Sequence, residues 1–395
     1  MTAETRKLRV SILRGGTSRG LFFHEDDLPK DRNDIGALLL NIMGSPDVRQ
    51  INGLGGATPQ TSKVAIIKRS LREDADIDYT FAQVDISRPF VDWGGNCGNI
   101  SSAVGPFAIN EALVDVPEGE ALGHVRIYNT NTGKIIVAHV PVVAGRAAVE
   151  GACFIAGVPS PGARIELEFR DPTGAVTGQT LPTGRPVDLI KLNDGWSCEV
   201  SVVDAANPSV FISADVFGLS GLELPAELEQ NFDFLRRIEE VRSQVAVLLD
   251  LVAEAANATA ETPGLPKIGI VAAPQDYEDS SGKFISADSY DIAVRMMSMQ
   301  FPHRACQITG GICLGVASLV PGSVASRYFS AVSGDSGRTA VRLGHPSGVM
   351  EVVVNGKLDS KSLDVAGVAV VRTARHILDG VVHVPERLYA HSNSN

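Results

Sequence analysis

Segments with the two-residue repeat of β-strands recur along almost the whole of this 395-residue chain, and no other feature restricts its fold as strongly. Most of them alternate apolar and polar residues between Gly, Pro, Asn or Asp, as half-buried strands usually do. One of them, 64–67, is continuously apolar instead. We expect strands at residues 8–13, 64–67, 77–86, 124–129, 135–143, 164–169 and 198–203. A chain with this many strands must bury them in sheets.

Helical patterns are fewer. Apolar residues recur at every third or fourth position over residues 34–43, 100–111, 235–256, 288–299 and 312–319, which predicts five helices. The pair Gly105-Pro106 should kink or interrupt the second of them. Because these helices do not alternate strictly with the strands, we predict an α+β fold with mixed or antiparallel sheets.

The chain is longer than the roughly 250–300 residues at which one hydrophobic core stops growing, so two domains are expected. Glycine-rich turns at 94–99 and 308–313 each open a helix, which indicates two similar halves. Pro and Gly cluster between residues 182 and 195, and residues 259–267 are rich in Thr, Pro and Gly and read as a loop. The predicted domains are therefore 1–186 and 187–395, with a cleft between them.

Composition excludes several classes of function. The net charge of −11 argues against nucleic acid or an anionic membrane as the main partner, because both require a basic surface. The five cysteines are widely spaced and form no CxxC pair, so we expect reduced thiols and no zinc site. No HExxH motif or cluster of His and carboxylates suggests a metal, and no apolar stretch reaches a membrane-spanning length. We expect a cytoplasmic protein without a metal or another cofactor.

Three polar, glycine-rich segments stand out in the first half, at residues 14–20, 53–63 and 92–99. Glycines let the backbone approach a ligand closely, and free N–H groups at a turn or helix start bind anions such as carboxylates. Each segment taken singly could equally be an ordinary loop.

Two residues within these segments could carry chemistry. Cys97 directly precedes a predicted helix, where free N–H groups and the helix dipole favour a thiolate, although it could also be a small core residue. Lys63 opens the apolar run 64–67. Burial there would favour the neutral amine, which can act as a base, but a lysine at the end of a strand more often has only a structural role.

Several pieces of the chain, in order, resemble the PrpF family, a group of methylaconitate-type isomerases with the diaminopimelate-epimerase-like fold. They are Arg14-Gly-Gly-Thr-Ser, Gly55-Gly-Ala-Thr, Thr61-Ser-Lys63, Phe90-Val-Asp-Trp, Gly95-Asn-Cys-Gly-Asn99 and Ala103-Val-Gly-Pro-Phe-Ala108, followed more weakly by Asn207-Pro208, Pro302-His303-Arg304 and Thr309-Gly-Gly. The resemblance implies two similar domains, each a mixed or antiparallel sheet wrapped around a central helix, with the active site in the cleft.

The resemblance also implies a cofactor-independent isomerase that acts on a small unsaturated polycarboxylate. The family includes isomerases of methylaconitate, methylitaconate, aconitate and 4-oxalomesaconate, and its lysine and cysteine match Lys63 and Cys97. These two residues are the expected catalytic groups. The expected substrate-binding residues are Arg14, Thr17, Ser18, Ser62, Asn96, Gly98, Asn99, His303, Arg304, Thr309, Gly310 and Gly311.

The expected reaction is a 1,3-allylic proton shift with Lys63 as the base, the proton returning from Lys63 or Cys97. Two alternatives stay open: an epimerase or racemase that uses Cys97, and a non-catalytic accessory protein of a dehydratase. Epimerases with this fold have a cysteine in each half, whereas the second-half turn here has Ile308 and Thr309, with Cys313 inside the helix. The sequence does not choose the substrate, and edge strands on two domains make a homodimer plausible.

Overall fold

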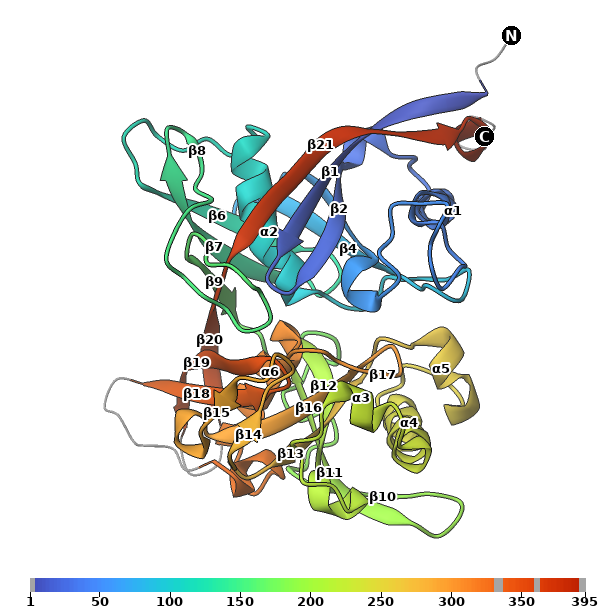
Figure 1. Cartoon of the computed structure of the whole chain (residues 1–395), viewed down its shortest axis with the longest axis vertical. Coiled ribbons are helices and arrows are strands. Elements are labelled where there is room, and N and C mark those ends of the chain that lie inside the picture. Colours follow the sequence, from blue (N-terminus) through green and yellow to red (C-terminus); the bar gives the residue numbers. More distant parts are fainter. Residues whose placement is uncertain (1–3, 330–336, 359–362, 391–395) are drawn as a thin grey trace.

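The computed structural model describes residues 4–329, 337–358 and 363–390, and it confirms an α+β fold. Figure 1 shows two lobes, one above the other, each with a sheet curved around a helix. The upper lobe is formed mainly by the first half of the chain and the lower lobe mainly by the second half.

The first lobe holds most of the strands that the sequence predicts. Its strands are β1 (Thr5–Gly15), β2 (Ser18–His24), β3 (Lys63–Arg69), β4 (Ile77–Val84), β5 (Val91–Asp92), β6 (Leu122–Asn129), β7 (Lys134–Val143), β8 (Arg146–Ala147), β9 (Ile165–Arg170) and β21 (Ala374–Pro385). Its helices are α1 (Arg32–Met43), α2 (Gly98–Asn110) and the short α7 (Arg387–Ala390).

The second lobe has the same mixture of strands and few helices. Its strands are β10 (Asp188–Lys191), β11 (Ser197–Ala205), β12 (Asn207–Ser213), β13 (Lys267–Ala272), β14 (Tyr277–Glu278), β15 (Phe284–Ile285), β16 (Ile292–Ser298), β17 (Phe301–Pro302), β18 (Arg338–His345), β19 (Gly348–Leu358) and β20 (Leu363–Arg372). Its helices are α3 (Pro225–Leu228), α4 (Phe232–Leu248), α5 (Ala258–Glu261) and α6 (Ile308–Leu319).

The two lobes repeat one strand topology. In the first, β1–β2 pair antiparallel, β2–β3 parallel, β3–β4 antiparallel, β4–β6 parallel, and β6–β7 and β7–β9 antiparallel. In the second, β11, β12, β13, β16, β18, β19 and β20 pair with the same succession of directions. The last strands of the two series, β9 and β20, pair with each other and join the sheets. The chain is therefore built from two copies of one sheet.

Each sheet encloses one apolar helix. Every residue of α6 is buried, and so is every residue of α2 except Asn110. Gly105 lets α2 approach the sheet, because a Cβ there would lie 2.8 Å from Val140 and 2.9 Å from Ala138. Contrary to expectation, Gly105-Pro106 does not interrupt α2, since the packing around a buried helix outweighs the loss of one backbone hydrogen bond at Pro106.

The last described strand does not belong to the lobe that precedes it in the sequence. β21 pairs antiparallel with β1 from Thr5↔Pro385 to Gly15↔Ala374, and Figure 1 shows it crossing into the upper lobe. The division into domains 1–186 and 187–395 stays a proposal, to which we add that residues 374–385 pack with the first domain.

Among the helix predictions, residues 288–299 were wrong. Residues Ile292–Ser298 form β16, which pairs with β13 and β18 in the second sheet. Residues 292–297 are all buried, and a short continuous apolar run cannot be assigned to helix or strand from its periodicity. The helix expected at 235–256 ends earlier, with α4 at Leu248, and Asp250 beyond it is left-handed (φ 55°). The loop expected at 259–267 begins in α5 and ends where Lys267 opens β13.

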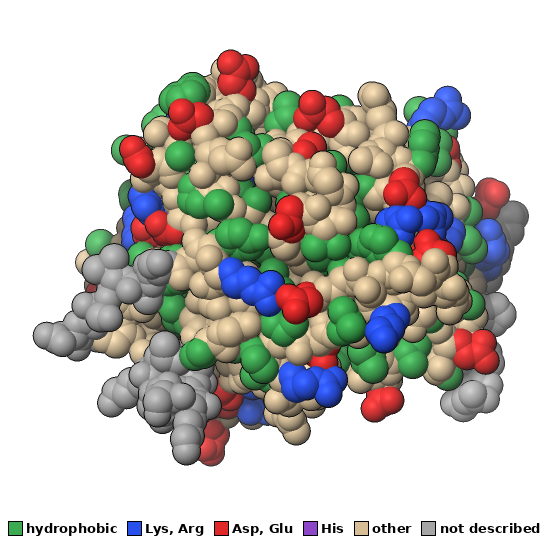
Figure 2. Space-filling view, turned by 90° about the horizontal axis from the view of Figure 1, so that it is seen from below, with side chains coloured by type: hydrophobic (Ala, Val, Ile, Leu, Met, Phe, Trp, Pro, Cys, Tyr) green, Lys and Arg blue, Asp and Glu red, His purple; other side chains and the backbone are tan. Residues whose placement is uncertain are grey.

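No helix among the described residues is both long enough and apolar enough to cross a bilayer. Figure 2 shows the face of the molecule seen from below, where Lys and Arg are interspersed with Asp and Glu. This mixed pattern differs from the continuous basic stripe of a nucleic-acid-binding surface.

Candidate active site

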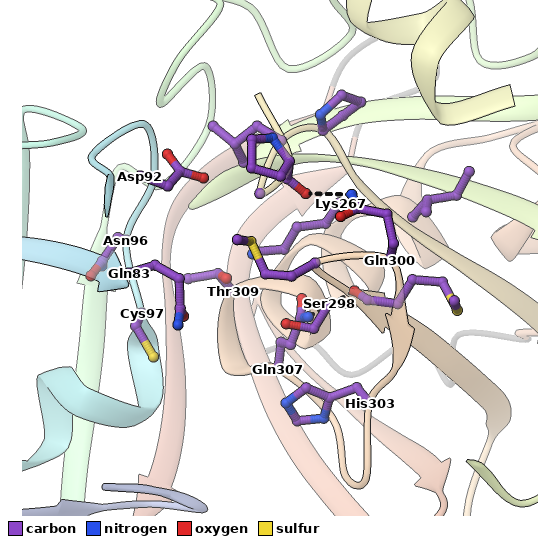
Figure 3. A pocket seen from close by; sticks show the side chains of 18 of the residues that line it. Gln83, Asp92, Asn96, Cys97, Lys267, Ser298, Gln300, His303, Gln307 and Thr309 are labelled. Atoms are coloured by element: carbon purple, nitrogen blue, oxygen red, sulfur yellow. Dashed lines mark hydrogen bonds between the residues drawn. The ribbon is translucent and has the colours of Figure 1, made fainter. Parts of the chain in front are cut away.

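The N-terminal ends of α2 and α6 meet where the two lobes face each other. A Cβ on Gly98, the first residue of α2, would lie only 2.7 Å from the side chain of Ile308, the first residue of α6. Free N–H groups and the positive ends of two helix dipoles therefore point to one place, which favours an anionic ligand. A cavity opens there, and residues of both lobes line it. In Figure 3, Gln83, Asp92, Asn96 and Cys97 approach it from one side, and Lys267, Gln300, His303 and Gln307 from the other.

Lys63 is the first residue of β3, and its buried amine lies in this cavity. Its Nζ donates a 2.5 Å hydrogen bond to Oε1 of Gln83 and lies 5.2 Å from the ring centroid of Phe81. The amide of Gln83 can point only this way, because its Nε2 donates to the backbone oxygens of Pro59 (3.1 Å) and Ser62 (3.0 Å). Gln83 therefore fixes the direction of the lysine amine.

Lys267 is the counterpart of Lys63 in the second lobe. It is the first residue of β13, which stands in the second sheet where β3 stands in the first, and it lines the same cavity. Burial lowers the pKa of Lys267 to about 8, and the positive charge of Lys63 acts in the same direction. The sequence analysis missed this residue, although a lysine that opens an apolar strand is the pattern that pointed to Lys63.

The turn before α2 is held by the second lobe. Asn96 is buried and Cys97, partly exposed, occupies the N-cap position of α2. Both backbone groups of Asn96 bond to the amide of the buried Asn207: its N–H donates to Oδ1 at 3.3 Å, and its oxygen accepts from Nδ2 at 3.0 Å. Nδ2 also donates to Oγ1 of Thr309 at 3.1 Å. One side chain thus connects the turn before α2 with the first turn of α6.

His303 supplies a neutral donor on the opposite side. Burial lowers its pKa to about 4, and the positive charges of Lys63 and Lys267 also lower it. Its Nδ1 accepts a hydrogen bond from the N–H of Ala305 at 3.0 Å, so the ring proton lies on Nε2. The imidazole is therefore a hydrogen-bond donor at neutral pH rather than a second cation.

Two polar atoms at the cavity lack a partner within the described part of the chain. They are the hydroxyl of Ser18, at the start of β2, and Oε1 of Gln307, at the N-cap of α6. Buried polar atoms are normally bonded, so these two indicate the contacts that a ligand would complete.

The cavity thus brings together eight of the residues predicted from the sequence: Lys63, Cys97, Ser18, Asn96, Gly98, Asn99, His303 and Thr309. Besides Lys267, it contains Gln83, Asp92 and Gln307, which the sequence analysis did not identify. These three lie outside the segments whose glycine content or family match was informative.

Six predicted residues do not line the cavity. Arg14 donates to the backbone oxygens of Gly16 and Thr373, both at 2.9 Å, and so shapes the β1–β2 turn. The N–H of Thr17 donates to Asn99 Oδ1, and the hydroxyl of Ser62 to Gln50. The side chain of Arg304 is 61% exposed and pairs with Glu229 at 2.8 Å.

The remaining two, Gly310 and Gly311, lie inside α6 and allow close packing of Met296 and Met350. None of the six placements supports direct contact with a substrate, and their roles are to hold turns and helices in place.

The described residues contain no group of three or more His, Cys, Asp or Glu side chains that could bind a metal ion. The cavity instead combines two amines, one thiol and several fixed hydrogen-bond donors. Such a set can remove a proton from carbon and stabilise the anion that results.

Known proteins resemble this chain over its full length. It is 46% identical over 377 residues to a putative isomerase of Bacillus subtilis (95% of this chain, 97% of the relative). It is 44% identical over 387 residues to the 3-methylitaconate isomerase of Eubacterium barkeri (97% and 98%). To the 2-methyl-aconitate isomerase of Shewanella oneidensis it is 37% identical over 391 residues (96% and 97%).

Solved structures agree. A methylitaconate-delta-isomerase structure superposes with a TM-score of 0.77 at 42% identity, covering 98% of both chains. A hydroxyproline epimerase from Agrobacterium vitis superposes with a TM-score of 0.53 at 10% identity (96% and 93% covered), which shows a shared epimerase-like fold. The model of the PrpF protein family matches residues 5–385. The chain therefore belongs to the PrpF family.

Proposed function

We propose that this chain is a cofactor-independent isomerase that shifts a proton between the ends of an allylic unit in a small unsaturated polycarboxylate. One observation carries the proposal: two lysines, Lys63 and Lys267, reach one cavity from equivalent positions of the two lobes, where two helix N-termini also meet. Amines can move the proton, and the helix ends favour the carboxylates of the substrate.

In the proposed reaction, neutral Lys63 takes a proton from the carbon next to the double bond. The C–H electron pair forms a new double bond, the original one shifts, and negative charge spreads into a conjugated carboxylate or keto group. The ammonium of Lys267, the Nε2–H of His303 and the N–H groups at the start of α2 stabilise that charge. A proton returned to the far carbon completes the shift.

The returning proton comes from Lys63 or from Cys97, both of which line the cavity. Lys267 is assigned to charge stabilisation because a lysine with a pKa of about 8 is mostly protonated at pH 7. Gln83 positions the base, and Asn207 holds the Asn96 turn against Thr309.

The candidate substrates are methylitaconate, methylaconitate, aconitate and 4-oxalomesaconate. The first two are named in relatives that this chain matches over almost its full length. All four carry several carboxylates next to an allylic carbon, as the arrangement of amines and helix ends requires.

The test is proton NMR in D₂O with each of the four acids, for the wild type and for Lys63→Met, Cys97→Ser and Lys267→Met. We expect deuterium at the allylic carbon together with migration of the double bond, abolished in Lys63→Met. Activity retained in Cys97→Ser would leave Lys63 as the group that returns the proton. If the wild type exchanges no proton on any of these acids, the proposal is wrong.

The thiols argue against an epimerase. The N-cap of α6, which corresponds to Cys97 at α2, is Gln307. Cys306 and Cys313 are buried, and burial raises the pKa of each to about 12. The second thiolate of a two-cysteine epimerase is therefore not provided at this end of α6. Inversion at one stereocentre without double-bond migration would reverse this conclusion. Recovery of a dehydratase in stoichiometric amounts, without any proton exchange, would instead favour an accessory protein.

A further inference from the structure

The hairpin between β16 and β17 has a strained two-residue tip at the candidate active site. Met297 pairs with Pro302 and Ser298 with Phe301, which leaves Met299 and Gln300 as the turn. Both residues are left-handed, with φ of 50° and 67°. Turns of this kind strongly prefer Asn-Gly, because side chains such as those of Met and Gln disfavour positive φ. Strain of this type concentrates at functional sites.

The tip is part of the cavity wall. Met299 and Gln300 line the cavity that holds Lys63 and Lys267, and they also line an adjoining groove next to residues 83–88 of the first lobe. Gln300 anchors the tip, because its Nε2 donates to the backbone oxygen of Pro263 at 3.1 Å. Figure 3 shows Gln300 beside Lys267.

The loop against which the tip rests is itself fixed. The buried Arg242 donates from Nη1 to the backbone oxygens of Thr262 (2.9 Å) and Leu265 (2.8 Å). Gly264 lies between Met299 and the first lobe: a Cβ there would lie 3.9 Å from Met299 Sδ and 2.3 Å from a carboxylate oxygen of Asp92. The thioether is therefore held in place at the boundary between the lobes.

Around the tip the cavity wall is apolar, made by Met299 together with Leu265 and Pro266. The hydrogen-bond donors of the site lie on other elements, at Lys63, His303 and the start of α2. A substrate carboxylate placed against the thioether would lose its water without gaining a donor, whereas a methyl group would be buried favourably.

We propose that Met299, held by the hairpin tip, determines substrate specificity by selecting an acid with a methyl substituent over the same acid without it. The inference rests on the proposed function, since it assigns the substituent that the proposed substrate carries. The left-handed conformation persists because it brings this side chain, rather than an unstrained Asn or Gly, to the cavity wall.

The test measures binding separately from reaction. Propane-1,2,3-tricarboxylate and butane-1,2,3-tricarboxylate differ by one methyl group and have no double bond, so their dissociation constants can be measured by calorimetry without turnover. We expect the wild type to bind the methyl-bearing acid about tenfold more tightly. The preference should stay within about threefold of this value in Met299→Leu, which keeps the apolar bulk, and should disappear in Met299→Asn.

Stability measurements show whether each variant folds and whether the tip is strained. Met299→Gly and Gln300→Gly should raise the melting temperature by about 1–3 °C, because glycine adopts positive φ without cost. A methyl preference unchanged in Met299→Asn, or absent from the wild type, would overturn the assignment. Proton exchange in D₂O is scored independently: exchange without methyl preference refutes only the role of Met299, and methyl preference without exchange refutes only the proposed isomerase.

Discussion

The side-chain amide of Asn207 pairs with both backbone groups of Asn96, its Oδ1 accepting from the Asn96 N–H at 3.3 Å and its Nδ2 donating to the Asn96 oxygen at 3.0 Å. Asn207 opens β12 in the second lobe, and Asn96 precedes α2 in the first. This contact aligns the two halves of the candidate site.

Asn207→Asp should therefore damage catalysis more than substrate binding. The replacement removes the donor to Asn96 and to Thr309 and leaves a buried charge in its place. We expect kcat to fall about 100-fold or more and the free energy of unfolding to fall by about 2–4 kcal/mol. Steady-state kinetics and urea denaturation measure the two effects. Asn110→Asp is the matched control, because Asn110 only accepts from Ala147. Equal losses in both variants would refute a role in alignment.

Gln83 offers a test of how Lys63 is positioned. In Gln83→Leu the amine loses its acceptor, and kcat should fall about 10- to 100-fold with little change in KM. In Gln83→Glu a carboxylate would hold the amine in its charged form, so activity at pH 7 should fall further and recover in part at higher pH. Activity of Gln83→Glu equal to that of the wild type across the pH range would show that Lys63 is not the base.

Lys267 should lower stability at neutral pH. Its pKa is about 8 in the folded chain and about 10.5 unfolded, so between these values the unfolded state binds more protons and stability rises with pH. Below pH 8 the folded state bears the full cost of the buried charge. Lys267→Met should thus raise the free energy of unfolding at pH 7 by about 1–3 kcal/mol, and the gain should disappear near pH 10. Urea denaturation at both pH values measures it. The exposed Lys191, changed to Met, should show no such difference.

His303 predicts a loss of stability in acid. Its pKa is about 4 in the folded chain and about 6.5 unfolded, so its contribution is complete above pH 6.5 and is lost as the pH falls toward 4. His303→Asn should be less sensitive than the wild type to a change from pH 7.5 to pH 5, by about 1–3 kcal/mol. Burial also lowers the pKa of His345, so part of the dependence remains in the variant. The exposed His383, changed to Asn, should retain the acid sensitivity of the wild type, and identical profiles for both variants would contradict this prediction.

Local patterns in the sequence predicted those parts of the structure that local patterns determine. Strands β4, β6 and β7 follow from alternation, and Lys63 and Cys97 lie in motifs that resemble a family. The methionine-rich strand β16 was mistaken for a helix, because a fully buried strand loses the alternation that identifies it. Lys267 and Asn207 gain their roles only when the second sheet faces the first, which no local pattern encodes. Arg304 shows the converse, since its match to the family motif did not reveal that its side chain points toward solvent.

The pairing of β21 with β1 also affects how the chain is made. A nascent chain leaving the ribosome exposes β1 early, but the strand that covers its open edge is synthesised only after the whole second lobe. The first lobe thus waits, incomplete and with an unpaired edge, during most of translation. Shortening the chain by its last two dozen residues would remove part of the first lobe, and we would expect such a product to depend on chaperones although every residue of the candidate site is present.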